Sequence, residues 1–200
     1  MKEDVPAAAA APLRLVAGLG NPGPRYSRTR HNAGFLVLAE LARRHGLSFT
    51  RRGGSEQARF GSALLLKPLT FMNRSGAEIQ AALTRQRLRP ENLLVVHDDV
   101  DLDTGRLRFR FGGSSGGQRG VQDTINRAGR DFWRLKLGIG RAPADRETAD
   151  WVLSRFRDEE AGLLEEMVAA AADAVETALR DGPEHAANRY SGFQAGGSRS

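Results

Sequence analysis

The amino-acid sequence predicts a single α/β domain built on a twisted, mixed and mainly parallel sheet with helices on both faces. Short apolar runs typical of buried strands alternate along the chain with segments of helical period. A length of 200 residues, 40% of them apolar, is enough for one domain with a sizeable core. No internal repeat or interdomain linker interrupts this alternation.

The first half of the chain alternates in this way. Residues 13–17 form an apolar run that predicts a buried strand. A helix that ends near Gly46 is indicated by apolar residues at helical spacing, namely Phe35, Leu38, Leu41 and Ala42. Residues 58–67 predict one strand or a hairpin arm. Ser75 and Glu78 have the spacing of a capping box, which predicts a helix running to about Leu88.

The second half continues the pattern. Residues 93–96 form an apolar strand that ends at His97 and Asp98, and residues 107–111 alternate as a half-exposed strand. A glycine-rich loop leads into a predicted helix at 121–128 and a strand at 133–139. The alanine-rich stretch 159–179 predicts a long helix.

The two ends differ in composition from the domain between them. Residues 1–12 predict a disordered N-terminal extension, residues 13–190 the folded domain, and the Gly/Ser-rich residues 191–200 a flexible tail. The first residues lack the basic and apolar regions of a signal peptide, and no apolar run is long enough to cross a bilayer. The chain has no cysteine, which excludes disulfides and cysteine-based zinc sites and suits the cytosol.

The net charge of +6 is spread unevenly. Residues 104–146 hold 10 basic and 3 acidic side chains, whereas residues 158–181 hold 8 acidic side chains and one arginine. A basic region of this kind predicts a polyanionic partner. The alternative is a solvated arginine-rich surface.

Four polar side chains follow predicted strands or the loops behind them. Asn21, Asn73 and Asp98 come just after strands, and His31 comes after the first glycine–proline loop. Because ligands of α/β sheets bind outside the carboxyl ends of the strands, these side chains are expected to meet there. His31 could act as a general base oriented by Asp98, with the two amides binding a carbonyl or a peptide group. The alternative roles are surface, turn and helix-capping residues.

Three other motifs allow different chemistry. Gly18, Gly20 and Gly23 match the dinucleotide fingerprint, although the next helix does not start at that loop. The loop around Ser115 matches the nucleophile elbow of serine esterases, but only His185 follows it. The aspartates at 98, 99 and 101 permit a divalent-ion site.

Alternating arginines on the strand 107–111 predict a cationic stripe. Arg106, Arg108 and Arg110 fall on one face, about 6.6 Å apart, and Arg134 and Lys136 repeat the alternation on the next strand. Such a stripe suits phosphate contacts. The alternative is a charged edge that discourages strand addition.

Five segments carry a resemblance to a known family. They are residues 18–23 (Gly-Leu-Gly-Asn-Pro-Gly), 29–34 (Thr-Arg-His-Asn-Ala-Gly), 67–76 (Lys-Pro-Leu-Thr-Phe-Met-Asn-Arg-Ser-Gly), 97–102 (His-Asp-Asp-Val-Asp-Leu) and 133–141 (Trp-Arg-Leu-Lys-Leu-Gly-Ile-Gly-Arg). Together with Tyr26 they resemble bacterial peptidyl-tRNA hydrolases in order and spacing. The resemblance runs from about Leu13 to Tyr190.

The resemblance implies a monomeric cytoplasmic esterase that frees tRNA from peptidyl-tRNA released by stalled ribosomes, with no metal or organic cofactor. His31 would activate water, Asp98 would keep His31 basic and oriented, and Asn21 would recognise the acylated amino group. The groove for the tRNA 3′ end would be lined by Tyr26, Phe71, Met72 and Asn73. Acceptor-stem phosphates would be bound by Arg108, Arg110, Arg134 and Lys136.

One loop departs from the family pattern. The family usually reads Gly-Gly-His-Asn-Gly where this chain reads Gly-Gly-Gln-Arg-Gly, with Gln118 and Arg119 in the variable positions. Arg119 cannot accept a hydrogen bond but can stack on a base or pair with phosphate. We expect it to bind the tRNA end, while water positioning falls to Asn73. A catalytically silent RNA-binding relative, a serine esterase and a nucleotide-dependent oxidoreductase are the alternative functions.

Overall fold

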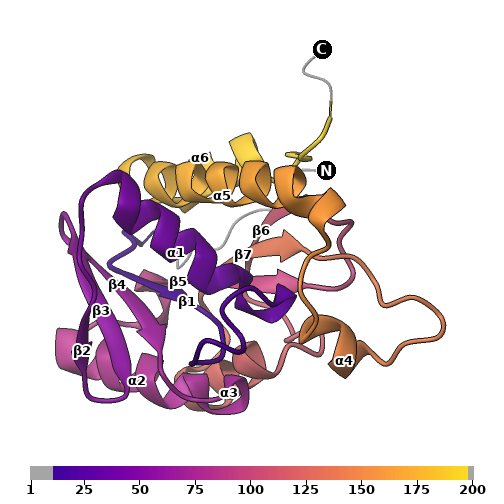
Figure 1. The fold of residues 1–200 in the computed structure, drawn as a ribbon. Coiled ribbons are helices and arrows are strands. Elements are labelled where there is room, and N and C mark those ends of the chain that lie inside the picture. Colours follow the sequence, from indigo (N-terminus) through magenta and orange to yellow (C-terminus); the bar gives the residue numbers. More distant parts are fainter. Residues whose placement is uncertain (1–10, 198–200) are drawn as a thin grey trace.

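The computed structural model describes residues 11–197, which form one seven-stranded mixed sheet with helices on both faces (Figure 1). The strand order is β2-β3-β4-β1-β5-β7-β6. Its strands are β1 (Leu15–Gly18), β2 (Thr50–Arg52), β3 (Ser55–Phe60), β4 (Ala63–Pro68), β5 (Leu93–Asp99), β6 (Leu107–Phe111) and β7 (Trp133–Gly138). The four central strands β4, β1, β5 and β7 run parallel, and antiparallel strands complete both edges. The carboxyl ends of the central strands therefore meet along one side of the molecule.

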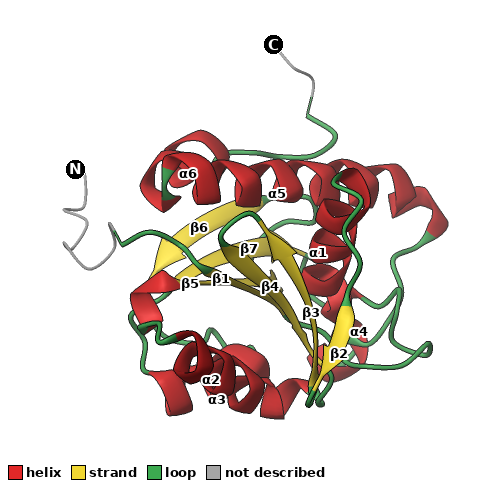
Figure 2. Cartoon of the chain, turned by 90° about the vertical axis from the view of Figure 1, so that its left-hand side faces the viewer, coloured by secondary structure: helices red, strands yellow, loops and turns green. Residues whose placement is uncertain are grey.

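Helices cover the sheet in two layers (Figure 2). One face carries α1 (Ala33–Arg44), α5 (Ala161–Asp181) and α6 (Pro183–Tyr190), and the other carries α2 (Ser75–Gln86) and α3 (Arg119–Ala128). The short helix α4 (Thr148–Val152) and the loop before it extend to one side (Figure 1). Single 3-10 turns precede several elements, namely η2 (Arg30–Asn32), η3 (Met72–Arg74), η4 (Pro90–Asn92) and η5 (Asp158–Glu160).

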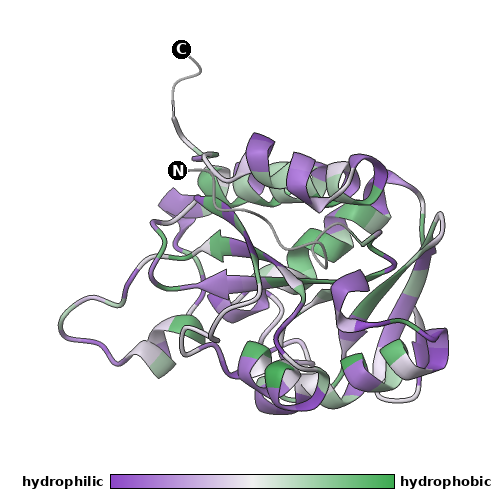
Figure 3. Ribbon diagram, turned by 180° about the vertical axis from the view of Figure 1, so that it is seen from behind, coloured by the Kyte–Doolittle hydropathy of each residue, from purple (hydrophilic) through white to green (hydrophobic). Residues whose placement is uncertain are grey.

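The alternation of strand side chains divides the core between the two faces of the sheet. On β5, Leu94 and Val96 pack with α1 and α5, whereas Leu93 and Val95 pack with α2 and α3. Both sets are fully buried, as expected for a parallel strand covered on both sides. The covering helices carry hydrophobic and hydrophilic residues in turn (Figure 3).

Most predicted elements are present, with three differences. Residues 58–67 form the two arms of a hairpin, β3 and β4. Asp98 lies within β5 instead of beyond it, because β5 continues to pair with β7 through Asp99. The capping box at Ser75 is wrong: η3 runs directly into α2, so Ser75 is already inside the helix and its hydroxyl is buried without a partner. The sequence reading did not identify β2, α4 or α6.

The described part of the predicted flexible tail is packed. Phe193 accepts a hydrogen bond from Leu107 N at 3.1 Å, Ser191 accepts one from Phe109 N at 3.1 Å, and Ala195 is buried. Residues 191–197 therefore lie along the outer edge of β6 and bond to it, and the flexibility expected of the tail stays a prediction. Residues 1–10 of the predicted extension and 198–200 of the tail lie outside the described residues. Within 11–197, no helix has the length and apolar character needed to cross a membrane.

Candidate active site

A cleft of about 480 Å³ lies at the carboxyl ends of the central strands. It collects side chains from the loop after β1, from η2, η3, the end of β5, the start of α3 and α4. The predicted residues that line it are Asn21, Tyr26, His31, Phe71, Met72, Asn73, Asp98 and Arg119. Segments far apart in the sequence thus meet where the predicted topology places them.

The centre of the cleft is a buried histidine–aspartate pair. His31 Nδ1 lies 2.8 Å from Asp98 Oδ2, and the two residues are 8% and 2% exposed. Because a carboxylate only accepts hydrogen bonds, Nδ1 is the donor, and the tautomer that carries its hydrogen there has a free lone pair on Nε2. This is the geometry of an oriented general base.

The second carboxylate oxygen of Asp98 is also bound. Gln118 Nε2 donates to Asp98 Oδ1 at 3.0 Å, and Gln118 Oε1 accepts from Val121 N at 2.8 Å, which caps the start of α3. The site prediction did not assign this residue a function. The available signal was its position in the loop that departs from the family pattern.

Asn21 is held on both sides by its neighbours. Its backbone exchanges two hydrogen bonds with the Asn32 side chain, each 2.9 Å, and its Oδ1 accepts from Met72 N at 2.8 Å. With Oδ1 engaged, the amide nitrogen Nδ2 is left to donate to a ligand in the cleft. Asn32 is therefore a supporting residue that positions Asn21, a role the sequence reading did not assign to it.

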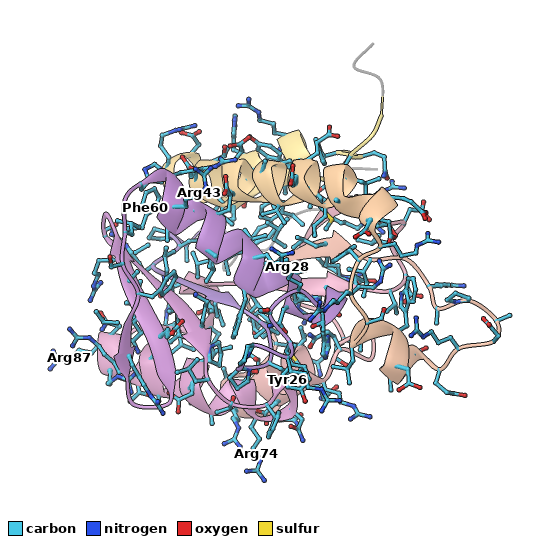
Figure 4. All side chains as sticks on the ribbon, in the orientation of Figure 1. Tyr26, Arg28, Arg43, Phe60, Arg74 and Arg87 are labelled. Atoms are coloured by element: carbon cyan, nitrogen blue, oxygen red, sulfur yellow. The ribbon has the colours of Figure 1, made fainter. Side chains whose placement is uncertain are left out.

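Aromatic, amide and cationic groups surround this pair. Phe71 is 60% exposed and Leu153 is 43% exposed, and both line the cleft. Tyr26 is half-buried and lies near the α2 and α3 layer (Figure 4). Asn73 and Arg119 are exposed, and neither side chain bonds to another described residue. Apolar surface beside free polar groups is typical of a cleft that binds a ligand of mixed character.

The predicted cationic stripe is present only in part. Arg108 and Arg110 are exposed on β6, outside the cleft, and Arg108 is opposite Lys136 in the ladder. Lys136 Nζ instead pairs with Asp99 Oδ2 at 2.6 Å. Burial acts to raise the pKa of Asp99, but the hydrogen bond and charge of Lys136 outweigh it and the pKa is lowered. Lys136 is thus largely neutralised by its own neighbour.

The predicted exposure of Arg134 on the cationic stripe is wrong. Its side chain is completely buried, and its guanidinium donates to the carbonyl oxygens of Gly113 and Ser114. Burial, and after it the charge of Arg110, lowers the pKa of Arg134 to about 10. A phosphate on the surface cannot reach this group. Arg134 tethers the glycine-rich loop that leads to Gln118.

Helix α4 forms one wall of the cleft, and its segment is bound to Arg30, the residue next to His31. The Arg30 guanidinium lies 3.8 Å from the Trp151 ring centroid and 4.5 Å from that of Phe156, and it pairs with Glu160 at 2.6 Å. Arg30 N also donates to Ser154 O at 2.9 Å. The segment around α4 is therefore anchored to the residue that precedes His31.

The alternative motifs have other partners. Ser115 Oγ donates to Gln122 Oε1 at 2.8 Å, and no described histidine bonds to it. A Cβ on Gly18 would lie 2.4 Å from Gly34 O, so this glycine serves close packing of β1 on α1. The three aspartates considered for an ion site have different partners: Asp98 binds His31, Asp99 binds Lys136 and Asp101 binds Arg141. None of the three arrangements supports the alternative chemistry.

Comparison with known proteins decides the family. A family model described as peptidyl-tRNA hydrolase matches residues 15–197. The chain belongs to the peptidyl-tRNA hydrolase family. A relative of that name from Deinococcus deserti is 51% identical over 172 residues, which cover 82% of this chain and 78% of the relative. A second, from Thermus thermophilus, is 46% identical over 180 residues, which cover 90% and 96%.

Solved structures of this family agree with the fold. The crystal structure of peptidyl-tRNA hydrolase from Acinetobacter baumannii matches with a TM-score of 0.86 and 30% identity, covering 92% of this chain and 96% of that one. As a member of the family, the chain is a hydrolase that acts on ester bonds.

Proposed function

We propose that this protein hydrolyses the ester bond between a peptide and the terminal ribose of tRNA, and so recycles tRNA from peptidyl-tRNA that stalled ribosomes release. The observation that carries the proposal is the 2.8 Å hydrogen bond between His31 Nδ1 and Asp98 Oδ2 inside the cleft of a chain of this family. The proposed place of action is the cytoplasm, the protein acts as a monomer, and its steps use no metal or organic cofactor.

The chemistry starts from a water molecule held in the cleft beside His31. Nε2 takes a proton from the water as the oxygen attacks the ester carbonyl carbon, and the proton then passes to the departing ribose oxygen. Asp98 stabilises the imidazolium that forms between these steps. General-base assistance of this kind contributes about 10²- to 10⁴-fold to the rate.

Asn21 gives the reaction its selectivity. Its Oδ1 is engaged by Met72 N, so the side chain presents an N–H donor. That donor suits the carbonyl oxygen of an N-acylated amino acid, whereas the ammonium group of a free aminoacyl ester offers no acceptor. Asn73, whose amide is exposed and bonds to no described side chain, positions the water or the developing oxyanion.

The outer part of the cleft binds the nucleic acid. Tyr26 and Phe71 offer rings for the terminal bases, Met72 lines the same groove, and Arg119 offers a free guanidinium for a base or a phosphate. Arg108 and Arg110 contact acceptor-stem phosphates further away. Lys136 contributes less to phosphate binding, because it is paired with Asp99.

A time course on N-acetyl-aminoacyl-tRNA beside unacylated aminoacyl-tRNA tests the proposal. The protein is expected to cleave the N-acetylated substrate selectively, and Asn21→Ala is expected to lose much of that selectivity. His31→Ala is expected to abolish cleavage while tRNA binding stays within about threefold, since its side chain supplies the base and little binding surface. Full activity of His31→Ala would rule out the assigned base.

A further inference from the structure

Gln118 is a buried polar residue to which the proposed reaction gives no part. It is 8% exposed, and its amide nitrogen lies 3.0 Å from the Asp98 oxygen that does not bind His31. We propose that Gln118 is a positioning residue for hydrolysis, which fixes the Asp98 carboxylate in the orientation that holds His31. The inference rests on the proposed roles of His31 and Asp98.

The orientation of the Gln118 amide is determined by its other bond. Oε1 accepts from Val121 N at 2.8 Å, so the acceptor end is used at the start of α3 and the donor end must face Asp98. A flipped amide would place an oxygen against the carboxylate and leave the Val121 N–H facing a donor. The helix end and the carboxylate therefore specify a single arrangement.

Asp98 requires such a partner because it is almost completely buried. A buried carboxylate oxygen without a donor is costly, and a carboxylate bound at one oxygen can rotate about its side-chain bond. Gln118 removes both problems with a neutral group. A lysine or arginine at this point would oppose the positive charge that His31 acquires when it takes the proton.

Gln118 also contacts Met72, the residue that orients the Asn21 amide. Its Nε2 lies 3.2 Å from Met72 Sδ, and Met72 N donates to Asn21 Oδ1 at 2.8 Å. The residue that orients the carboxylate thus touches the residue that orients the selective amide. The base and the acyl-binding group are positioned by one continuous set of contacts.

Gln118→Asn separates the positioning role from the helix cap. Asparagine is one of the best N-cap residues, but it is one methylene shorter and does not reach Asp98. We expect kcat on N-acetyl-aminoacyl-tRNA to fall by about 10- to 100-fold, with KM within about twofold, because a hydrogen bond to a buried charge is lost. The matched control is Gln122→Asn, the same change at an exposed position of α3, which is expected to keep wild-type kcat.

A double-mutant cycle with Asp98→Ala shows whether Gln118 acts through the carboxylate. Under single-turnover conditions, Gln118→Asn is expected to change the rate less than twofold in the Asp98→Ala background. An equal loss in both backgrounds, or a wild-type kcat in the single variant, would overturn the proposal. Should Gln118→Asn fold poorly, Gln118→Glu keeps the length and a helix-capping oxygen, but its ionised carboxylate has no N–H to donate to Asp98, and the same loss is expected.

The outcomes separate this inference from the proposed function. If the wild-type protein fails to cleave the acylated substrate, or if His31→Ala cleaves it fully, the proposed function is wrong. If both behave as expected and Gln118→Asn keeps its kcat, only the positioning role is wrong.

Discussion

At the scale of single residues, the site depends on Asp98 and Asn21, whose side-chain oxygens all accept hydrogen bonds. Asp98 accepts from His31 at one oxygen and from Gln118 at the other, and Asn21 uses its oxygen for Met72 N. Each ligand-facing group is thereby left with one defined hydrogen-bonding function. That assignment makes substitution by close isosteres informative.

Asp98→Asn is expected to lower kcat by on the order of 10³-fold. Asparagine offers one acceptor oxygen to two donors, so either His31 or Gln118 loses its partner and the histidine tautomer is no longer fixed. Steady-state kinetics with a thermal melt measures the effect. Asp101→Asn, an exposed aspartate close by, is the control and is expected to match the wild type. A loss below tenfold at Asp98 would contradict the expectation.

The burial of His97 is expected to make the stability of the protein depend on pH. Burial lowers its pKa from 6.5 to about 4, against the opposing charges of Asp98 and Asp99, and Lys136 acts in the same direction as burial. As the pH falls below 6.5, the unfolded chain binds a proton that the folded protein does not bind until about pH 4. The free energy of unfolding is therefore expected to fall by about 3 kcal/mol over that window from this group.

Urea denaturation between pH 7 and pH 4 measures this effect. His97→Gln is expected to remove this fall in the free energy of unfolding with decreasing pH. His185→Gln, at an exposed position of α6, is expected to retain it. An unchanged dependence of the free energy of unfolding on pH in His97→Gln would show that burial of His97 does not cause it.

The residue identities of the site were predictable, but their environments were not. His31, Asp98, Asn21 and Asn73 were selected because they follow strands and glycine loops, and all four line the cleft. Arg134 was placed on an exposed stripe by strand alternation. The alternation is correct, but the glycine-rich loop folds over that face and buries the guanidinium, and a long-range cover of this kind has no local signal.

At the scale of elements, the closest approach of α2 and α3 depends on glycine. A Cβ on Gly76 would lie 2.4 Å from Asp123 O, whereas a Cβ on Gly162 would meet nothing within 4 Å. Both are second residues of their helices, α2 and α5. The pair is therefore a matched test of packing against helix propensity.

Gly76→Ala is expected to destabilise the protein by about 1–3 kcal/mol, because α2 must move from the α3 backbone. Gly162→Ala is expected to be neutral or to stabilise by up to about 1 kcal/mol. Chemical denaturation of the two variants gives both numbers. Equal effects at the two positions would show that the α2–α3 contact is not tightly packed.

Elements with a strong apolar period were predictable, whereas those held by tertiary contacts were not. Strands β1, β5 and β7 and helix α5 carry long apolar runs or periods. In contrast, β2 is Thr-Arg-Arg with all three residues exposed, so only its pairing with β3 makes it a strand. Helix α4 has five residues and depends on Trp151 and its contact with Arg30.

At the scale of the whole molecule, charge is divided between opposite sides of the sheet. The basic region contains β6, α3 and β7, and the acidic region is α5, which lies on the face away from α3 (Figure 1). A polyanion is therefore attracted to one side and repelled from the other. We expect this division to orient tRNA before any specific contact forms.

The double variant Arg108→Ala/Arg110→Ala is expected to weaken tRNA binding and to reduce the slope of log Kd against log salt by about 2. Arg52→Ala is the control, since Arg52 is also exposed but lies on β2 at the opposite edge of the sheet. Binding of deacylated tRNA at several salt concentrations measures the slopes. A similar change in the control would place the binding surface elsewhere.

The sandwich of Arg30 between Trp151 and Phe156 has a mechanical consequence. One wall of the cleft is attached to Arg30, the residue immediately before His31, so we expect a bound group that displaces this wall to displace His31 as well. We therefore expect the width of the opening and the position of His31 to change together, through the single buried cation of Arg30.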